Sequence, residues 1–376
     1  TFEKKISLTE KTAAALPAKW PFVKLGDIAN VLIGGTPSRN YPAFFTGANL
    51  WVSIAEMNGS IITDTKEKIT DEAIKKSNVK LIPKGTTLLS FKLSIGKTAI
   101  AGSDLYTNEA IAGLIPKNNT SVTNSYLFQI FNAKHIDLDK TGFKAFGKSL
   151  NSSFLKEDVL IPLPPLEIQQ QIVTECEALD AEAIAAQAAI DAARKAIEST
   201  VNSVLSSNHP VKKLGDICKM QAGKFVSPSE IADQKGESMF PCYGGNGLRG
   251  FTKTFTHDGT YPLIGRQGAL CGNVNKAEGK FHATEHAVVV TPNSDINVHW
   301  LYYQLKSLNL NQYATGAAQP GLSVKNILVV TTPVPPLAEQ QRIVTEVEKL
   351  EKQIAESQEI MAAAPARKQA IMQRYL

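Results

Sequence analysis

Apolar residues follow a regular helical spacing along residues 172–197. The positions, which alternate in steps of four and three, are Ile172, Cys176, Leu179, Ala183, Ala186, Ile190, Ala193 and Ile197. This is the heptad spacing of a coiled-coil seam, in which one apolar stripe faces a partner helix. The stripe follows Pro164-Pro165-Leu166, and proline is tolerated in the first turn of a helix. The pattern therefore predicts a long helix that begins next to Pro165.

A second stripe repeats the first at a constant offset of 171 residues. Its members, which follow Pro335-Pro336-Leu337, are Ile343, Val347, Leu350, Ile354, Ser357 and Met361. One stripe alone is typical of ordinary helix packing, but two matched stripes favour two long helices that pack as an antiparallel coiled coil. Alanines on the first seam allow close approach, and about 40 residues at a rise of 1.5 Å give a rod of roughly 60 Å. We expect Pro365 to break the second helix near its end, with a kink or a short separate turn.

The segments before each helix have a different texture. Residues 20–162 and 210–333 alternate short runs rich in Val, Ile, Leu, Thr and Tyr with breaks at Gly, Asn, Pro and Ser. Such runs indicate strands, while 71–77 and 126–132 have helical patterns. Regular alternation of strand and helix is missing, so a doubly wound sheet is not favoured. The prediction is an α+β fold with mixed domains.

The second half of the chain restates the first in the same order. Lys24-Leu25-Gly26-Asp27-Ile28 returns as Lys213-Leu214-Gly215-Asp216-Ile217. Asn108-Glu109-Ala110 aligns with Thr284-Glu285-His286. Because several such matches occur in register, a tandem duplication is favoured over chance. The predicted parts are a first domain at 1–163, a first helix at 164–208, a second domain at 209–334 and a second helix at 335–376, with pseudo-twofold symmetry.

Composition narrows the function only slightly. The chain has 376 residues and a formal net charge of +5, which permits a nucleic-acid partner without requiring one. Its four cysteines are far apart and form no CxxC pair, so we expect free thiols. No apolar run approaches the ~20 residues that span a bilayer, and a cytoplasmic location is expected. Since the chain starts at Thr1, it is interpreted as a processed product, a trimmed chain or part of a longer polypeptide.

In these features the chain resembles the DNA specificity subunits of type I restriction-modification enzymes. In that family each variable recognition domain is followed by a long helix that a Pro-Pro-Leu-x-x-Gln-Gln-like motif opens. Residues 164–170 and 335–341 fit this motif, although Ile168 stands where Glu is usual. The further similar stretches are Trp20 with Leu25-Gly26-Asp27, then 34–39, 51–52, 94–97, 265–268 and 315–321. The similarity extends over nearly the whole chain.

The resemblance implies a non-catalytic subunit that recognises a bipartite site on double-stranded DNA. Two methyltransferase (modification) subunits would dock on the helices, and restriction/translocase subunits would join them. Two readers on one face of B-DNA should engage half-sites about one helical turn, or ~34 Å, apart. The residues that we expect at the helix–helix and partner interface are Ile172, Cys176, Leu179, Ile190, Ile197, Ile343, Val347, Leu350 and Ile354.

Loops rich in glycine carry the candidate DNA contacts. Phosphates require donors, and base edges require paired donors and acceptors such as Arg, Asn and Gln. The candidates in the first domain are Gly34, Gly35, Thr36, Ser38, Arg39, Lys92 and Lys97. Those in the second domain are Tyr243, Asn246, Arg249, Arg266, Gln267 and Gln319. A tight turn with a solvated Arg39, isolated surface lysines, and a packed rather than stacking Tyr243 are the competing interpretations.

Two motifs suggest other chemistry but lack the required context. Residues 245–250 match GxGxxG, but a strand pattern follows where a dinucleotide site needs a helix. His282-Ala283-Thr284-Glu285-His286 has a zinc-peptidase spacing, which works only on a helix, and a strand pattern follows here as well. Motifs for methyl transfer, nucleotide hydrolysis or DNA cleavage are not found. We therefore expect no cofactor, no metal and no catalytic residue, with all chemistry coming from partners.

Two alternatives stay open at this point. The chain could be the recognition module of a single-chain restriction-methylation enzyme, like types IIB and IIG. It could also be a coiled-coil scaffold whose β-rich domains bind carbohydrate or peptide, although the two basic, glycine-rich loop sets argue against this. With a charge of only +5, we predict weak and salt-sensitive DNA binding by the isolated chain.

Overall fold

The chain folds into two compact units that both contain helices and strands. The computed structural model describes residues 19–118, 121–136, 138, 151–268, 270–316 and 321–376. Unit 1 comprises Thr1–Ala185 and Ile360–Leu376, and unit 2 comprises Ala186–Glu359. The unit boundary crosses both long helices, so each unit combines one domain with a segment of each helix. The predicted α+β class with two mixed domains is confirmed.

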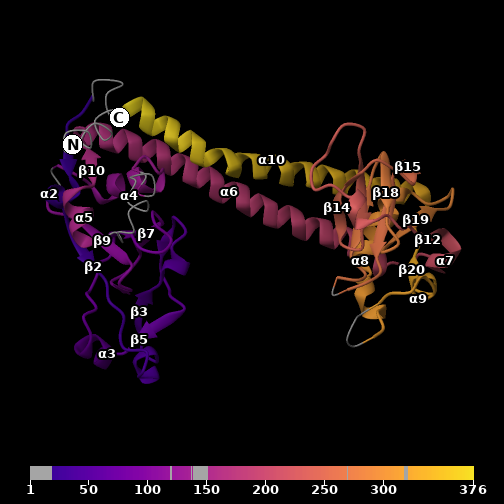
Figure 1. Ribbon diagram of the computed structural model, residues 1–376, viewed down its shortest axis with the longest axis horizontal. Helices are drawn as coiled ribbons and strands as arrows, with labels where there is room; N and C mark the ends of the chain where they lie inside the picture. The colour runs from indigo at the N-terminus through magenta and orange to yellow at the C-terminus, as the bar shows by residue number, and fades with distance from the viewer. Residues whose placement is uncertain (1–18, 119–120, 137, 139–150, 269, 317–320) are drawn as a thin grey trace. The chain divides into compact units, whose positions relative to one another are not determined.

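Unit 1 contains three small sheets (Figure 1). Their strand orders are β1-β10, β2-β9-β6-β7-β4 and β5-β3-β8. The strands are β1 (Phe22–Lys24), β2 (Ala29–Ile33), β3 (Asn49–Val52), β4 (Ile61–Ile62), β5 (Glu67–Ile69), β6 (Thr87–Ser90), β7 (Thr98–Ala101), β8 (Tyr106–Thr107), β9 (Ile111–Pro116) and β10 (Leu160–Pro162). The helices are α2 (Leu25–Ile28), α3 (Asp71–Lys76), α4 (Asn124–Asn132) and α5 (Ser152–Glu157), with 3-10 turns η1 (Pro42–Phe45) and η2 (Ile54–Glu56).

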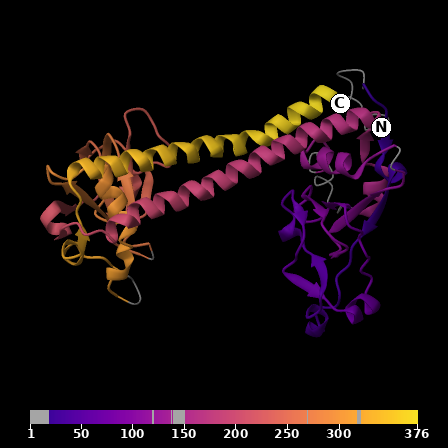
Figure 2. The same ribbon diagram turned by 180° about the vertical axis from the view of Figure 1, so that it is seen from behind.

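Unit 2 repeats the central strand pairings of unit 1, but its described residues form two four-stranded sheets in place of the five- and three-stranded ones (seen from behind in Figure 2). Its strand orders are β11-β20, β12-β19-β16-β17 and β14-β13-β18-β15. The strands are β11 (Val211–Lys213), β12 (Cys218–Ala222), β13 (Phe240–Gly244), β14 (Gly247–Thr252), β15 (His257–Asp258), β16 (Tyr261–Gly265), β17 (Val274–Ala277), β18 (Lys280–Ala283), β19 (Ala287–Pro292) and β20 (Thr331–Pro333). The helices are α7 (Leu214–Ile217), α8 (Val298–Ser307) and α9 (Val324–Leu328), with 3-10 turns η4 (Pro228–Glu230) and η5 (Leu310–Tyr313). The parallel pair β3–β8 has its counterpart in β13–β18, which supports the duplication.

Long helices follow both proline pairs, as the heptad pattern predicts: α6 spans Leu166–Leu205 and α10 spans Leu337–Tyr375. A buried glutamine clamps the start of each helix. Gln169 Nε2 donates to the carbonyls of Ser121 (2.8 Å) and Pro164 (2.9 Å), and its Oε1 accepts from Thr123 N (3.2 Å). Gln340 does the same in unit 2, where it bonds Pro335 O and the backbone N–H that precedes α8. The first Gln of the motif is therefore a structural residue that ties each helix to its domain.

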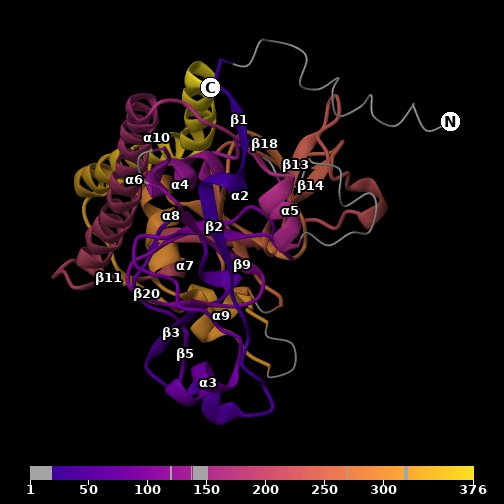
Figure 3. The same cartoon turned by 90° about the vertical axis from the view of Figure 1, so that its left-hand side faces the viewer.

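The ends of the two helices run antiparallel within unit 1. The paired side chains from α6 and α10 are Glu175 with Arg374 and Tyr375, Asp180 with Lys368, and Glu182 with Arg367. Their residue numbers rise on one helix as they fall on the other. Figure 3 shows α4 next to α6 at one end of unit 1, and β3, β5 and α3 at the other end. In unit 2 the opposite segments pair, and Val201 and Val204 of α6 share a core with Ile343 and Val347 of α10.

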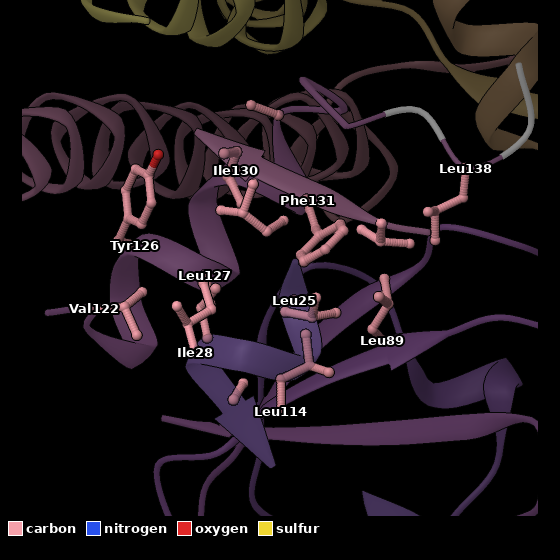
Figure 4. Packing of buried hydrophobic residues seen from close by; sticks show 14 of the residues in the cluster. Leu25, Ile28, Leu89, Leu114, Val122, Tyr126, Leu127, Ile130, Phe131 and Leu138 are labelled. Carbon is pink, nitrogen blue, oxygen red and sulfur yellow. The ribbon is translucent and has the colours of Figure 1, made fainter. Parts of the chain in front are cut away.

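The repeated Leu-Gly-Asp-Ile motif forms a one-turn helix in the core of each unit. Leu25 and Ile28 of α2 pack among side chains from α4, β6 and β9 (Figure 4). Leu214 and Ile217 of α7 are buried in the same way in unit 2. A Cβ on Gly26 would lie 2.8 Å from the carbonyl oxygen of Lys156, so only glycine fits between α2 and α5. At Gly215, the second copy, a Cβ would lie 3.2 Å from Leu328 O, so the same contact with the following short helix is close but less strict.

Two further expectations have definite outcomes. The four cysteines are buried free thiols, and burial raises the pKa of Cys176 to about 11 and that of Cys218 to about 12. The separate turn expected after Pro365 is wrong, because α10 continues through this residue to Tyr375, while a kink at Pro365 stays a prediction. The ring is exposed, and Ile371 and Met372 beyond it are buried in the core of unit 1. Their burial offsets the lost backbone hydrogen bond. None of the described helices is long and apolar enough to cross a membrane.

Candidate nucleic-acid interface

The loop after β2 holds the first group of predicted DNA contacts. Gly34 N donates to Ile111 O (3.1 Å) and Gly35 N donates to Thr107 O (2.8 Å), so the loop lies against the turn between β8 and β9. A Cβ on Gly34 would lie 2.2 Å from Thr107 Oγ1. Both glycines are buried. Because they have no side chain, two backbone segments of the domain pack closely here, and the glycines are not an approach surface for phosphate.

Arg39 projects from this loop, but it is not a freely solvated side chain. Its Nη1 and Nη2 donate to Glu67 Oε1 (2.5 Å) and Oε2 (2.8 Å). The guanidinium also lies 4.1 Å from the ring centroid of Phe45 and 5.2 Å from that of Trp51. The hydrogen bond from Arg39 holds the pKa of the Glu67 carboxyl below its usual value. Arg39 is thus held in one orientation with half of its side chain exposed, and Ser38 next to it is also exposed.

The tight loop after β6 holds the predicted lysines. Leu93 has a positive φ of 59° and is 86% exposed, so the loop projects from the sheet. Lys92 is half-buried with its amine 5.4 Å from the Phe91 ring centroid, and Lys97 is exposed with its amine 3.4 Å from Ile54 O. Phe91 N donates to Ala110 O (3.0 Å), so the Lys92 loop lies beside the turn that holds Glu109 and packs on the Gly34 loop. The structure therefore brings two of the predicted segments together.

A basic pocket next to Lys92 was not predicted. It has a volume of roughly 350 Å³, and Lys80, Lys92 and Lys156 line it together with Asn151 and Ser152. Lys80 and Lys156 come from segments far apart in the chain. As isolated lysines they carried no signal in the sequence, and only the fold places their charges at one site.

Three loops of unit 2 come together at the end of β16. A Cβ on Gly265 would lie 1.8 Å from Gly245 O, which places the β13–β14 turn directly against this strand end. Arg266 N donates to His286 O (3.1 Å), which adds the β18–β19 turn. Asn246, at the tip of the β13–β14 turn, is exposed. Asn246, Arg266 and Gln267 thus lie in one region of unit 2.

The other predicted residues of unit 2 differ in how exposed they are and in what they contact. Arg249 is exposed and lies beside the β18–β19 turn, because a Cβ on Gly244 would be 3.7 Å from Arg249 Cδ and 3.8 Å from Thr284 Oγ1. Tyr243 packs edge-on against Phe281 at 5.7 Å, which favours the packing interpretation. Arg266 is half-buried and its Nε atom has no hydrogen-bond partner in the described structure, while Gln267 is exposed. Gln319 lies outside the described residues.

The heptad side chains lie between helices and domains. Those that are buried are Ile172, Cys176, Leu179, Ile190, Ile343 and Val347. Ile197, Leu350 and Ile354 are half-buried, and Ile197 packs against the core of unit 2. Their burial supports a helix–helix role, which stays a prediction for the individual residues. Because most of them are covered within their own unit, a partner subunit would have to contact the outer faces of the helices.

The two discounted motifs do lie on strands and turns. The segment 247–252 after the glycine pair is strand β14, and no helix follows it. His282 lies on β18, where its ring nitrogens are 3.0 Å from Thr254 Oγ1 and 3.1 Å from Lys224 O. His286 lies in the next turn rather than on a shared helical face. Both motifs are part of the scaffold of unit 2.

These features define a duplicated protein, with one scaffold present twice and a different set of Arg, Lys and amide side chains on the loops of each copy. The model of the type I restriction modification DNA specificity domain matches the chain twice, at residues 17–193 and 207–363. The chain belongs to the family of type I restriction enzyme specificity subunits.

Individual relatives agree with this assignment. The specificity subunit of the type I enzyme EcoprrI from Escherichia coli is 34% identical over 358 residues, which is 89% of this chain and 88% of that protein. The MjaIX specificity subunit of Methanocaldococcus jannaschii is 30% identical over 258 residues, or 61% of this chain and 59% of that protein. The crystal structure of the type I S subunit from M. genitalium has a similar fold, with a TM-score of 0.61 at 16% identity over 96% of this chain and 97% of that chain.

Proposed function

We propose that this chain is the DNA-recognition subunit of a type I restriction-modification enzyme and reads a bipartite target. In this proposal residues 1–163 read one half-site and 209–334 the other, while the helices at 164–208 and 335–376 set the spacer. The observation that carries it is the repetition of one strand topology with different loop chemistry in each copy. A duplicated scaffold with unlike loops is suited to two unlike half-sites.

Positive charge and loop-borne polar groups supply the contacts. In unit 1, Lys92 and Lys97, with Lys80 and Lys156 of the basic pocket, bind phosphates and set the register on the duplex. Arg39 presents its guanidinium to a guanine edge. Its stacking on aromatic rings orients the side chain, and an exposed ion pair such as that with Glu67 contributes little free energy, so exchanging it for a base contact is inexpensive.

In unit 2 the predicted amides and arginines form the second reader. Asn246, Gln267 and Gln319 offer the paired donor and acceptor that an adenine edge requires. Arg249 and Arg266 offer the donors that a guanine edge or a phosphate requires. The unlike chemistry of the two sets predicts two unlike half-sites.

Catalysis belongs to the partners in this proposal. Two methyltransferase (modification) subunits dock on the helices, and restriction/translocase subunits complete the enzyme. Among the described residues, no group of three or more His, Cys, Asp or Glu side chains is placed to hold a metal ion. The duplicated scaffold offers two equivalent positions, which is what two copies of one partner require.

The experiment that tests this function is the mapping of methylated adenines in cells that carry this chain with its modification subunit. The expected result is one motif made of two short sequences at a fixed gap. Removing one heptad from both long helices should shorten the gap or abolish modification, while a silent recoding of the same codons is the control. Methylation that is independent of this chain, or a footprint without a protected bipartite site, would refute the proposal.

A further inference from the structure

One turn occurs in both units with a carboxylate at the same position. In unit 1 the turn joins β8 to β9, and Glu109 is its second residue, after Asn108. In unit 2 the turn joins β18 to β19, and Glu285 is its second residue, after Thr284. Asn108 and Thr284 both stabilise the turn by accepting from a backbone N–H two residues ahead. The carboxylate therefore has the same position in two otherwise different loop sets.

The scaffold holds both turns in place. The glycine after β2 packs on the first turn, and Gly223 after β12 packs on the second, where a Cβ would lie 2.2 Å from Ala283 O. Gly223 N also donates to Ala287 O (2.9 Å), as Gly34 N does to Ile111 O. The position of each carboxylate is thus set by buried backbone contacts rather than by the loops that differ between the units.

Glu109 lies among the predicted DNA contacts of unit 1. Its side chain is exposed and accepts a hydrogen bond from Thr36 Oγ1. That hydrogen bond, helped by the charges of Lys92 and Arg39, lowers the pKa of the carboxyl. Glu109 is therefore ionised at neutral pH and acts only as an acceptor.

Glu285 has the same place in unit 2 but keeps an unused acceptor. Its side chain is 35% exposed and its Oε1 lies 3.2 Å from His286 Nε2, while its Oε2 is buried without a hydrogen-bond partner in the described structure. The residue that corresponds to Thr36 is Phe225, which is 72% exposed and has no hydroxyl to donate. Arg249 lies beside the same turn, since a Cβ on Gly244 would lie 3.7 Å from Arg249 Cδ and 3.8 Å from Thr284 Oγ1. Because Oε2 is buried, an external donor reaches this carboxylate at Oε1, where it competes with the partly exposed His286.

We propose that Glu109 and Glu285 each read one base of their half-site by accepting from an exocyclic amino group in the major groove. This inference rests on the proposed function. Cytosine and adenine carry the only such donors there, whereas guanine and thymine present acceptor oxygens. A carboxylate therefore attracts the first two bases and repels the others, which adds exclusion to recognition. The neighbouring arginines and Lys92 offset the repulsion between each carboxylate and the phosphates.

The test uses the assembled modification enzyme with Glu109→Gln or Glu285→Gln. The amide keeps the shape but can also donate, so guanine or thymine becomes acceptable at one position. We expect Glu109→Gln to reduce discrimination by about 5- to 150-fold at one base of one half-site, with the other half-site unchanged. Glu285→Gln should do the same in the opposite half-site. Methylation rates on duplexes with each single substitution give these ratios.

Controls separate base reading from a structural role. Glu157→Gln and Glu348→Gln remove exposed carboxylates from α5 and α10 and should leave the motif unchanged. Thr36→Val removes the donor to Glu109; if Glu109 reads a base, the preference persists, whereas matching losses in Thr36→Val and Glu109→Gln would show that the carboxylate only holds the loop. Thermal unfolding midpoints confirm that each variant folds.

Three results would overturn the inference. One is an unchanged motif in both glutamine variants. Another is a uniform loss of rate on all duplexes, which indicates a positioning role. In either case the wild-type enzyme still yields a bipartite motif, so the proposed function stands. If the wild type itself yields no such motif, the proposed function fails and this inference fails with it.

Discussion

A buried ion pair in unit 1 gives the sharpest prediction about stability. The amine of Lys368 on α10 lies 2.5 Å from Asp180 Oδ1 on α6 and 3.4 Å from Gln129 Oε1 on α4. Gln129 Nε2 donates to the other oxygen of Asp180 (3.3 Å). The Lys368 side chain is 6% exposed, but that of Asp180 is 38% exposed. Loss of Asp180 therefore leaves a buried charge, whereas loss of Lys368 leaves a carboxylate that water can still reach.

Removal of Asp180 leaves a buried cation without its partner. Such losses typically destabilise a protein by about 3–5 kcal/mol. Asp180→Ala should therefore lower the thermal midpoint of unit 1 by roughly 10 °C.

Removal of Lys368 is predicted to be much milder. In Lys368→Met the new side chain is apolar and stays buried. The exposed part of Asp180 keeps its contact with water. Replacement of a buried ionic group by an apolar one of similar volume is often neutral, so we expect a change within about 1 kcal/mol. Unit 2 shows that this is feasible: Ile197 stands at the equivalent position, and Glu351, which corresponds to Asp180, accepts from Tyr303 Oη at 2.8 Å.

The assay is urea unfolding of the isolated chain, with hydrogen exchange used to assign each transition to a unit. A protein of two units need not unfold in one step, so the transition of unit 1 is compared between variants. Arg367→Met, which removes the exposed ion pair with Glu182, is the matched control and should change the free energy of unfolding by less than about 1 kcal/mol. If Lys368→Met destabilises unit 1 as much as Asp180→Ala does, the reasoning from unequal burial is refuted.

Three further predictions concern unit 1. Gln169→Leu should lower the free energy of unfolding by about 2–3 kcal/mol, because it leaves buried backbone groups unpaired. The control is Gln170→Leu, which changes the exposed neighbour. Equal effects of the two variants in urea unfolding would contradict the proposed role of Gln169 in holding the helix start. Gly34→Ala should lower the free energy of unfolding by about 1–3 kcal/mol, because the added Cβ overlaps Thr107. An unfolding midpoint equal to that of the wild type would contradict this packing. Stability should fall modestly below pH 5, since the lowered pKa of Glu67 makes its pairing with Arg39 favourable at neutral pH and lost as the pH falls through that pKa. Arg39→Ala should flatten the acid limb of the stability profile, and an unchanged slope would argue against the pair.

The order and type of the major elements were readable in the sequence because they depend on local patterns. Heptad spacing and the proline pairs indicated both long helices, which begin at Leu166 and Leu337. The repeated words indicated a duplication, and the shared strand topology agrees with it. A glycine pair followed by a strand pattern was enough to discount a nucleotide site. Periodicity and turn chemistry act over a few residues, so one chain displays them without its fold.

Other features were decided only by tertiary structure. Pro365 has the local signature of a helix break, yet α10 passes through it because residues beyond it are buried in unit 1. The sequence alone allows Arg39 to be a solvated side chain, and only the fold pairs it with Glu67. Lys80 and Lys156 meet at one pocket although 76 positions separate them in the chain. Burial, ion pairing and shared charge arise between distant segments, and local sequence carries no record of which distant side chain will be the neighbour.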